Sequence, residues 1–114
     1  MLTSNRGITM DVNSIGLSGL NAAALGVSVT ANNIANANTK DFRAQRLDLE
    51  DLAQGGTRPA ALRERQEPPV SEGSNVDLAS EFTNLITQSG AYQANLKVIQ
   101  TQSQILGSAL DLKA

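Results

Sequence analysis

A series of mostly apolar side chains in the C-terminal third of the chain recurs at alternating intervals of four and three residues. The series is Leu78, Phe82, Leu85, Ser89, Tyr92, Leu96, Ile99, Ser103, Leu106 and Leu110. This heptad spacing predicts an α-helix with a continuous stripe along one side. Because the last 35 residues contain no proline, we expect one helix about 50 Å long at 1.5 Å per residue. A stripe of that length requires a partner surface, either another helix of the chain or another copy of it.

The N-terminal part of the chain repeats the pattern with smaller side chains. Its series is Leu17, Leu20, Ala24, Val27, Ala31, Ile34 and Asn38. This spacing predicts a second heptad helix, over residues 12–38. The alanines of this helix can receive the large side chains of the C-terminal helix, so the two backbones can approach closely. The sequence therefore predicts an antiparallel pair of helices.

Between the two helices, the heptad spacing is lost. Two short runs with partial alternation, residues 42–49 and 58–65, flank the glycine pair Gly55-Gly56. This arrangement predicts a loose β-hairpin. Pro59 lacks an N–H group, so we expect its strand to lie at a sheet edge or to begin near this residue. Residues 66–75 are rich in proline, glycine and polar side chains and are expected to form an extended connector.

These elements define a mainly α-helical fold class. Two long terminal helices are expected to pair as an antiparallel, coiled-coil-like hairpin, with a short irregular and β-hairpin segment between them. Only three aromatic residues are present among 114, so we expect a thin core. The expected organisation is a flexible N-terminus at 1–11, a helix at 12–38, a middle segment at 39–75 and a helix at 76–114.

Several asparagines lie near the end of the first predicted helix, although asparagine is a poor helix former. They are Asn32, Asn33, Asn36 and Asn38. One interpretation is that the last turns fray and the asparagines cap the helix and turn the chain. The other is that their amides, each with two donated hydrogens and an acceptor oxygen, bond to neighbouring backbone in an interface. The residues alone leave both interpretations open.

The composition argues against catalysis. The chain has no histidine and no cysteine, so the commonest general base and the usual soft-metal ligands are missing. The acidic residues Asp48, Glu50 and Asp51 are best interpreted as a solvated face, with a hard-cation site as the alternative. An enzyme would need a carboxylate in a cleft, for which Glu50 and Glu81 are the nearest candidates. We expect no enzyme activity, no metal and no cofactor.

The net charge and the apolar composition also limit the classes of partner that the chain can bind. A formal net charge of −2 argues against nucleic-acid binding, which usually leaves a basic patch. The alanine- and leucine-rich apolar content suits helix packing better than a pocket for a small-molecule substrate. We expect no membrane span, because no stretch approaches the roughly 18 or more uncharged apolar residues that a span requires. We also expect no cleaved secretory signal, because residues 1–10 lack a basic flank followed by an apolar run.

Two short motifs stand at the ends of the predicted helices. The pattern A-x-N-[IL]-A-N-x-x-T begins at Ala31 and is followed by the aromatic residue Phe42. The pattern N-V-D-x-x-x-E begins at Asn75, and A-Y-x-A-N begins at Ala91. Together, and in this order, the motifs resemble the paired terminal signatures of the bacterial flagellar rod and hook family. Lys40-Asp41 stands where that family usually has a glycine or proline turn before the aromatic residue.

The resemblance implies a structural subunit of the flagellar axis that serves flagellum-dependent motility. Family members pair their terminal helices in the inner core of a helical tube, which is built from many copies and from sister proteins. The implied location is the periplasm-spanning rod of the basal body, reached by flagellar type III export without a cleaved signal. The implied partners are therefore the chain itself, sister rod proteins and the export apparatus. The short middle segment is more similar to proximal rod proteins than to distal rod or hook proteins.

Pattern and resemblance together identify one set of candidate residues for helix pairing and assembly. In the first helix they are Leu17, Leu20, Ala24, Val27, Ala31, Asn33, Ile34 and Asn36. In the second helix they are Phe82, Leu85, Tyr92, Asn95, Leu96, Ile99, Leu106 and Leu110. The alternative function is that of a non-axial helical adaptor or chaperone, which would bind a rod protein through the same helices and remain in the cytoplasm.

Overall fold

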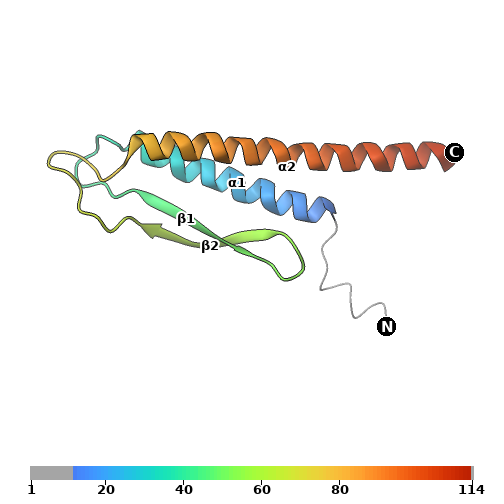
Figure 1. Cartoon of the computed structure of the whole chain (residues 1–114), viewed down its shortest axis with the longest axis horizontal. Helices are drawn as coiled ribbons and strands as arrows, with labels where there is room; N and C mark the ends of the chain where they lie inside the picture. The colour runs from blue at the N-terminus through green and yellow to red at the C-terminus, as the bar shows by residue number, and fades with distance from the viewer. Residues whose placement is uncertain (1–11, 114) are drawn as a thin grey trace.

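A computed structural model describes residues 12–113, which form an elongated, mainly helical molecule (Figure 1). Its elements are α1 (Val12–Ala35), β1 (Gln45–Asp51), β2 (Thr57–Glu64) and α2 (Leu78–Lys113). The two helices lie side by side and antiparallel, and the C-terminal end of α2 extends past α1. The predicted helical hairpin with a β-hairpin between its helices is confirmed. The predicted flexible segment at 1–11 lies outside the described residues.

The chain leaves α1 through a tight turn, so this helix is three residues shorter than the predicted 12–38. The backbone N–H of Asn36 bonds to the carbonyl oxygens of Asn32 (3.1 Å) and Asn33 (3.2 Å). Asp41 then adopts a φ of 63°, a left-handed conformation that the short polar side chains of Asn and Asp tolerate better than most. Its N–H donates to the carbonyl oxygen of Gly73 (2.9 Å). Aspartate thus occupies a turn position for which glycine is the usual residue.

Asp77 caps the N-terminus of α2. Its carboxylate accepts hydrogen bonds from the backbone N–H groups of Ala79 (3.1 Å) and Ser80 (3.4 Å) and from the Ser80 hydroxyl (3.1 Å). These bonds, led by the one from the Ser80 backbone, hold the pKa of Asp77 below its ordinary value of 3.8. They satisfy N–H groups that would have no partner inside the helix. The helix then runs for 36 residues.

The strands β1 and β2 pair as an antiparallel hairpin, from Gln45 opposite Glu64 to Asp51 opposite Thr57. The register shifts between Asp48 and Leu49, which pair with Ala61 and Pro59. This bulge lies where Pro59 offers no N–H group to the ladder. Figure 1 shows the hairpin alongside α1.

The hairpin turn depends on its glycine pair. Gly55 and Gly56 have φ angles of 101° and 90°, a region that side chains disfavour. A Cβ at Gly55 would also lie 3.0 Å from the Ile15 side chain. The tip of the hairpin is therefore fitted closely to α1, and the backbone N–H of Thr57 donates to the Ser18 hydroxyl (3.2 Å).

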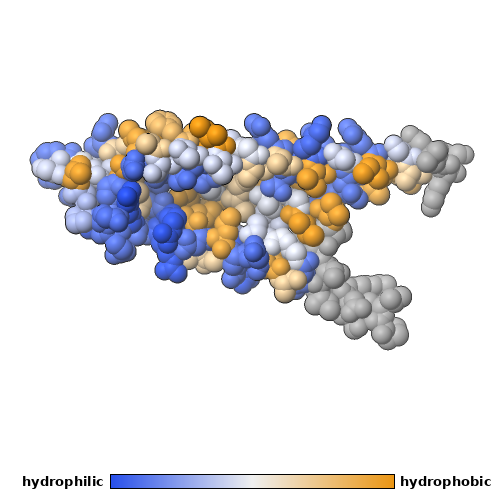
Figure 2. Space-filling model, viewed as in Figure 1, coloured by the Kyte–Doolittle hydropathy of each residue, from blue (hydrophilic) through white to orange (hydrophobic). Residues whose placement is uncertain are grey.

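Few side chains are buried among the described residues. The buried apolar ones are Ala22, Ala23 and Ala44, and the buried polar ones are Thr30, Asn33, Ser74, Asn75 and Glu81. Large apolar side chains remain at the surface instead, as the orange patches along the molecule in Figure 2 show. The expected thin core is confirmed in this part of the chain, and polar contacts supply much of what is buried.

Candidate assembly interface

The contact between α1 and α2 is made at three glycines of α1. A Cβ atom at Gly19 would lie 2.6 Å from Asn95 Oδ1 and 2.8 Å from Asn95 Cγ. The other close approaches are Gly16 to Ile99 and Gly26 to Gln88, both at 3.1 Å. A Cβ atom at Gly19 would overlap the end of the Asn95 side chain, so the two helices meet closely there and a larger residue would require that side chain to move.

Buried polar groups lie along the same contact. Asn33, only 1% exposed, donates from Nδ2 to Glu81 Oε1 (3.0 Å) and to the carbonyl oxygen of Gln45 (2.8 Å). Its Oδ1 accepts the backbone N–H of Gln45 (2.9 Å). One amide therefore joins α1, β1 and α2. One turn earlier in α1, the Thr30 hydroxyl donates to Gln88 Oε1 (2.9 Å).

We call Glu81, Gln88 and Asn95 the polar seam of α2. These three residues are spaced by seven, and so are the α1 positions they meet, Asn33, Gly26 and Gly19. The sequence interpretation assigned the heptad to apolar residues and missed Glu81 and Gln88 as contact residues. The signal that could have found them is a second, polar series with the same period on a neighbouring position of the helix.

The predicted stripe of α1 lies one residue further along the chain than the observed contact. Apart from the buried Ala22, the positions that are buried or that contact α2 are Gly16, Gly19, Ala23, Gly26, Thr30 and Asn33. The predicted apolar series follows each of these by one position: Leu17, Leu20, Ala24, Val27, Ala31 and Ile34. Leu17, Ala24 and Ala31 are exposed, and the other three are half-buried. The cause is the close backbone approach, which admits only small or polar side chains at the centre of the contact.

The two predicted asparagines of α1 have different roles. Asn33 makes the interface bonds described above, whereas Asn36 lies in the turn after α1. The Asn36 side chain donates to the Asn32 carbonyl (2.9 Å) and accepts from the Thr39 hydroxyl (3.1 Å). Both interpretations of the asparagine-rich segment therefore apply, each to a different residue.

The predicted series of α2 divides into two sets. Leu85, Tyr92 and Ile99 alternate with the polar seam at intervals of four and three, and Leu85 and Ile99 are half-buried. The remaining apolar members are exposed by 37% to 68%. We call this set the exposed stripe: Leu78, Phe82, Leu96, Leu106 and Leu110. Ile86, 74% exposed, adds a further apolar side chain one turn after Phe82.

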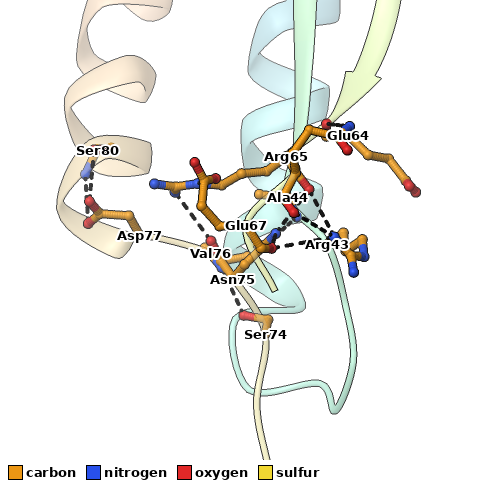
Figure 3. A network of polar contacts seen from close by, with 11 residues as sticks. Arg43, Ala44, Glu64, Arg65, Glu67, Ser74, Asn75, Val76, Asp77 and Ser80 are labelled. Carbon is orange, nitrogen blue, oxygen red and sulfur yellow. Dashed lines mark hydrogen bonds and ion pairs between the residues drawn. The ribbon is translucent and has the colours of Figure 1, made fainter. Parts of the chain in front are cut away.

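Figure 3 shows the polar network where the hairpin, the connector and α2 meet. Asn75 accepts the backbone N–H of Ala44 and donates to the carbonyl oxygens of Arg65 (3.2 Å) and Glu67 (2.7 Å). Arg65 in turn donates to the Asn75 carbonyl oxygen (3.2 Å) and pairs with Glu67 (2.7 Å). The bond from Arg65 holds the pKa of Glu67 below its ordinary value of 4.5. This network fixes the start of α2 relative to the hairpin.

The acidic residues of the hairpin pair with arginines. Asp48 accepts from Arg46 (2.9 Å) and Arg63 (2.6 Å), and these bonds, the one from Arg46 first, hold its pKa below 3.8. Glu50, one of the two candidate catalytic carboxylates, is exposed and forms an ion pair with Arg58. Within residues 12–113, no group of three or more His, Cys, Asp or Glu side chains is placed to hold a metal ion.

The helix α1 carries no charged residue and is long and apolar enough to cross a membrane, by length and composition alone, with a mean hydropathy of 1.3. The sequence interpretation underestimated the mean hydropathy of this helix, because its alanines, glycines and leucines are interspersed with asparagine, serine and threonine. In the structure, Thr30 and Asn33 of α1 bond to α2, and Ser18 bonds to the hairpin. One side of α1 therefore packs against the rest of the protein, although only 28% of its apolar window is buried.

Both helices match known families. Residues 70–112, which include most of α2, match the family described as flagellar basal body rod FlgEFG protein C-terminal. Residues 14–43, which include most of α1 and the following turn, match the family described as flagella basal body rod protein. The two matches cover the same parts of the chain as the motifs found in the sequence.

Individual relatives include rod and hook proteins. The flagellar basal-body rod protein FlgC of Yersinia enterocolitica is 27% identical over 129 residues, covering 90% of this chain and 96% of that protein. The flagellar hook protein FlgE of Borreliella burgdorferi is 32% identical over 110 residues, covering 96% of this chain but 22% of that protein. The flagellar hook protein FlgE of Caulobacter vibrioides is 42% identical over 65 residues, covering 57% of this chain and 10% of that protein. The chain thus spans less than a quarter of the length of these hook proteins.

Proposed function

The chain belongs to the flagellar basal-body rod and hook family of structural proteins, and we propose that it is a rod subunit that assembles through its exposed helix surfaces. The family membership rests on matches at both terminal helices and on relatives that are rod and hook proteins. These are structural proteins and not enzymes, in agreement with the expectation from composition.

The observation that carries the proposal is the exposed stripe of α2. Phe82 is 50% exposed and Ile86 is 74% exposed, although each would gain from leaving water. Burial of apolar surface contributes about 25 cal/mol per Å², and exposed apolar patches of this kind mark interaction surfaces. Contacts between copies would bury side chains for which the helical hairpin itself has no partner surface. The predicted α1 residues Leu17, Ala24 and Ala31, which are also exposed, would extend the same interface.

The lengths of the relatives favour a rod subunit over a hook subunit. The FlgC alignment covers nearly all of both chains, whereas each hook protein contains a large region without a counterpart here. The described middle segment consists of one small hairpin and a connector. A subunit of this kind would contribute to the axial tube without a large outer domain.

The proposed partners are copies of the chain, sister rod proteins and the flagellar type III export apparatus. The proposed location is the periplasm-spanning rod of the basal body, reached without a cleaved signal, and the proposed role is in flagellum-dependent motility. These points follow from the resemblance to the family and from the exposed stripe. They differ from the adaptor alternative in one observable respect, because an adaptor would remain in the cytoplasm.

Quantitative mass spectrometry of purified basal bodies and of the cytoplasmic fraction tests the proposal. A rod subunit should be present in several copies per basal body, at a ratio to its sister proteins that is constant between preparations. Replacing Phe82 by serine should lower that ratio without lowering the cytoplasmic amount. A cytoplasmic pool with no copies in the basal body would contradict the proposal and favour the adaptor.

A further inference from the structure

The charged residues are distributed unevenly along the chain. The helix α1 has none, and Lys97 is the one charged residue in the stretch of α2 from Phe82 to Leu110. Residues 39–77, by contrast, carry most of the charges, and Figure 2 shows hydrophilic side chains over the hairpin that this segment forms. The surface that the two helices offer to another copy is therefore almost free of charge, with Lys97 as the exception.

Lys97 lies on the side of α2 away from the polar seam. It is two residues from Asn95 and two from Ile99, both of which meet α1, and two residues turn an α-helix by about 200°. Lys97 is exposed and shares its side of the helix with Ile86, which is 74% exposed. Among the side chains that the structure describes, Lys97 has no ion-pair partner.

A copy that covers this side of α2 has to accommodate the ammonium group of Lys97. An ammonium group that loses its water without a partner is costly, and lysine is almost never fully buried unless it is paired. The neighbouring part of α2 offers no partner, because residues 82–110 contain no acidic residue. A carboxylate from another part of the assembly is therefore required.

Four carboxylates in the described residues 39–77 neither form an ion pair nor cap a helix. They are Asp41, Asp51, Glu64 and Glu72. All four are exposed, so each could meet a neighbouring copy without a change in the fold. Their positions along the long axis of the molecule distinguish them.

Asp51 is level with Lys97 along that axis. It lies opposite Thr57 at the tip of the hairpin, and the Thr57 N–H donates to the Ser18 hydroxyl of α1 (3.2 Å). Two residues before Ser18, a Cβ atom at Gly16 would lie 3.6 Å from Val98 of α2. Figure 1 shows the hairpin tip alongside the N-terminal end of α1.

The other three carboxylates lie toward the opposite end. Glu64 pairs with Gln45, which bonds to the same Asn33 amide as Glu81, and Glu81 lies about 24 Å before Lys97 along the helix axis. Asp41 bonds to Gly73 in the connector before α2, and Glu72 precedes that glycine. Asp51 is thus the unpaired carboxylate that a neighbour lying alongside brings to the level of Lys97.

We propose that Lys97 of one copy pairs with Asp51 of a second copy that lies beside it at the same level. This inference rests on the proposed function, because another copy has to cover the outward side of α2. In the part of the chain that the structure describes, the two side chains form no ion pair, and no Cα of either strand lies within 8 Å of a Cα of α2. The pair is therefore a contact between copies.

The pair would set the register between neighbouring copies. Apolar contacts along a heptad helix change little when a neighbour slips by one heptad, about 10 Å, since one apolar residue replaces another. The same slip separates Lys97 from Asp51 and leaves two charges unpaired at the contact. A single charge pair on an uncharged helix surface thus supplies specificity that the exposed stripe lacks.

Charge-reversal variants test the pair in assembled rods. Lys97→Glu brings two carboxylates together in the proposed contact, and Asp51→Lys brings two ammonium groups together. We expect each variant alone to be about tenfold less abundant in purified basal bodies than the unmodified chain, because like charges in contact are strongly unfavourable. When the two variants are expressed together, alternating copies again place opposite charges side by side, so incorporation should be restored. Quantitative mass spectrometry of the basal bodies measures both results.

The matched control replaces Asp51→Lys by Glu64→Lys. Glu64 is also exposed and unpaired on the hairpin, but it is not level with Lys97. The mixture of Lys97→Glu with Glu64→Lys carries the same charges and should not restore incorporation. Since all three side chains are exposed, the far-UV circular dichroism of each isolated variant should match that of the unmodified chain.

The outcomes separate this inference from the proposed function. Unmodified incorporation of Lys97→Glu would overturn the pair and leave the rod proposal standing. Restoration by the doubly substituted chain but not by the mixture would place both groups in one copy and would also overturn it. Asp11 precedes Val12, which borders the same small pocket as Lys97, and restoration by Asp11→Lys in place of Asp51→Lys would assign the partner to Asp11 instead. Absence of the unmodified chain from basal bodies would contradict both proposals.

Discussion

The two sides of α2 reverse the arrangement usual for a helix in a small soluble domain. The side that meets α1 presents the polar seam, including Glu81 at 7% exposure. Elsewhere on the helix, the exposed stripe and Ile86 leave large apolar side chains in water. On α2, the polar seam thus faces α1 together with the half-buried Leu85 and Ile99, whereas most of the large apolar side chains of the helix are left for contacts outside the chain.

The comparison indicates a division of roles between the two surfaces. Buried hydrogen bonds contribute modestly to net stability, on the order of 1 kcal/mol each, but an unmatched polar group is costly. The polar seam therefore fixes which residues of α1 and α2 meet more than it stabilises the pair. The exposed stripe offers the larger gain from burial, and this gain is available only on assembly.

The largest expected effect comes from removing the amide that joins three elements. In Asn33→Ala, the Glu81 carboxylate loses a hydrogen-bond donor in a buried position, and the Gln45 backbone loses both partners on that side chain. We expect a loss of about 3 kcal/mol in the free energy of unfolding. Urea unfolding followed by far-UV circular dichroism at low protein concentration measures it.

The matched control is Asn21→Ala, at an exposed position of the same helix. Since alanine is a better helix former than asparagine, this variant should be unchanged or slightly stabilised. Equal stabilities of the two variants would show that the amide at position 33 has no special role in holding the helices together.

The fold class could be predicted from the sequence because it depends on period. Two heptad series separated by a segment with a glycine pair are enough to predict two helices and a hairpin. The positive φ angles of Gly55 and Gly56 are the physical basis of that signal. Asp41 gave no such signal, because aspartate adopts left-handed backbone only where the surrounding turn requires it.

The rotation of α1 could not be predicted from its apolar pattern. Leu17 and Leu20 are the more hydrophobic residues, but Gly16 and Gly19 permit the closer backbone approach. The side of α1 that faces α2 is therefore the side with these two glycines. A hydrophobic series also does not distinguish a surface that faces the same chain from one that faces another copy. Phe82 was therefore assigned to both helix pairing and assembly, and the structure leaves it exposed.

The second-largest expected effect tests how closely α1 and α2 pack, by comparing the stabilities of two glycine variants. A Cβ at Gly19 would overlap Asn95, whereas a Cβ at Gly90 would have no neighbour within 4 Å. We expect Gly90→Ala to gain up to about 1 kcal/mol from helix propensity. Gly19→Ala should be less stable than Gly90→Ala by about 2 kcal/mol, because crowding opposes the same gain in propensity.

Thermal and urea unfolding of both variants, compared at equal low concentration, measure this difference. Similar gains in the two variants would mean that α1 and α2 can separate at Gly19 without cost. The close backbone approach would then not explain why small residues occupy the contact positions of α1.

The third effect tests the exposed stripe. Phe82→Ser should leave the free energy of unfolding of the isolated chain within about 0.5 kcal/mol, because the side chain is half exposed. The protein concentration at which assemblies form should rise about tenfold, equivalent to about 1.4 kcal/mol of lost contact. Gln93→Ser, also at an exposed position, is the control and should change neither quantity. A destabilised monomer with unaltered assembly would assign Phe82 to the fold instead.

The smallest expected effect concerns the N-terminal cap of α2. Acid protonates the Asp77 carboxylate without changing the residues of the polar seam or of the exposed stripe. The pKa of Asp77 is lowered in the folded state by its bonds from Ser80 and Ala79. Its contribution is therefore fully present above pH 3.8, the ordinary value, and is lost as the pH falls through the lower folded-state pKa. Asp48 and Glu67, whose pKa values are also lowered, titrate in the same acid range, and their contribution to the pH dependence must be subtracted.

Asp77→Asn keeps an acceptor at the cap but does not titrate, so its stability should fall less steeply with pH below 3.8 than that of the unmodified chain. Parallel curves would show that the ionised form of Asp77 adds nothing to the hydrogen bonds of the cap.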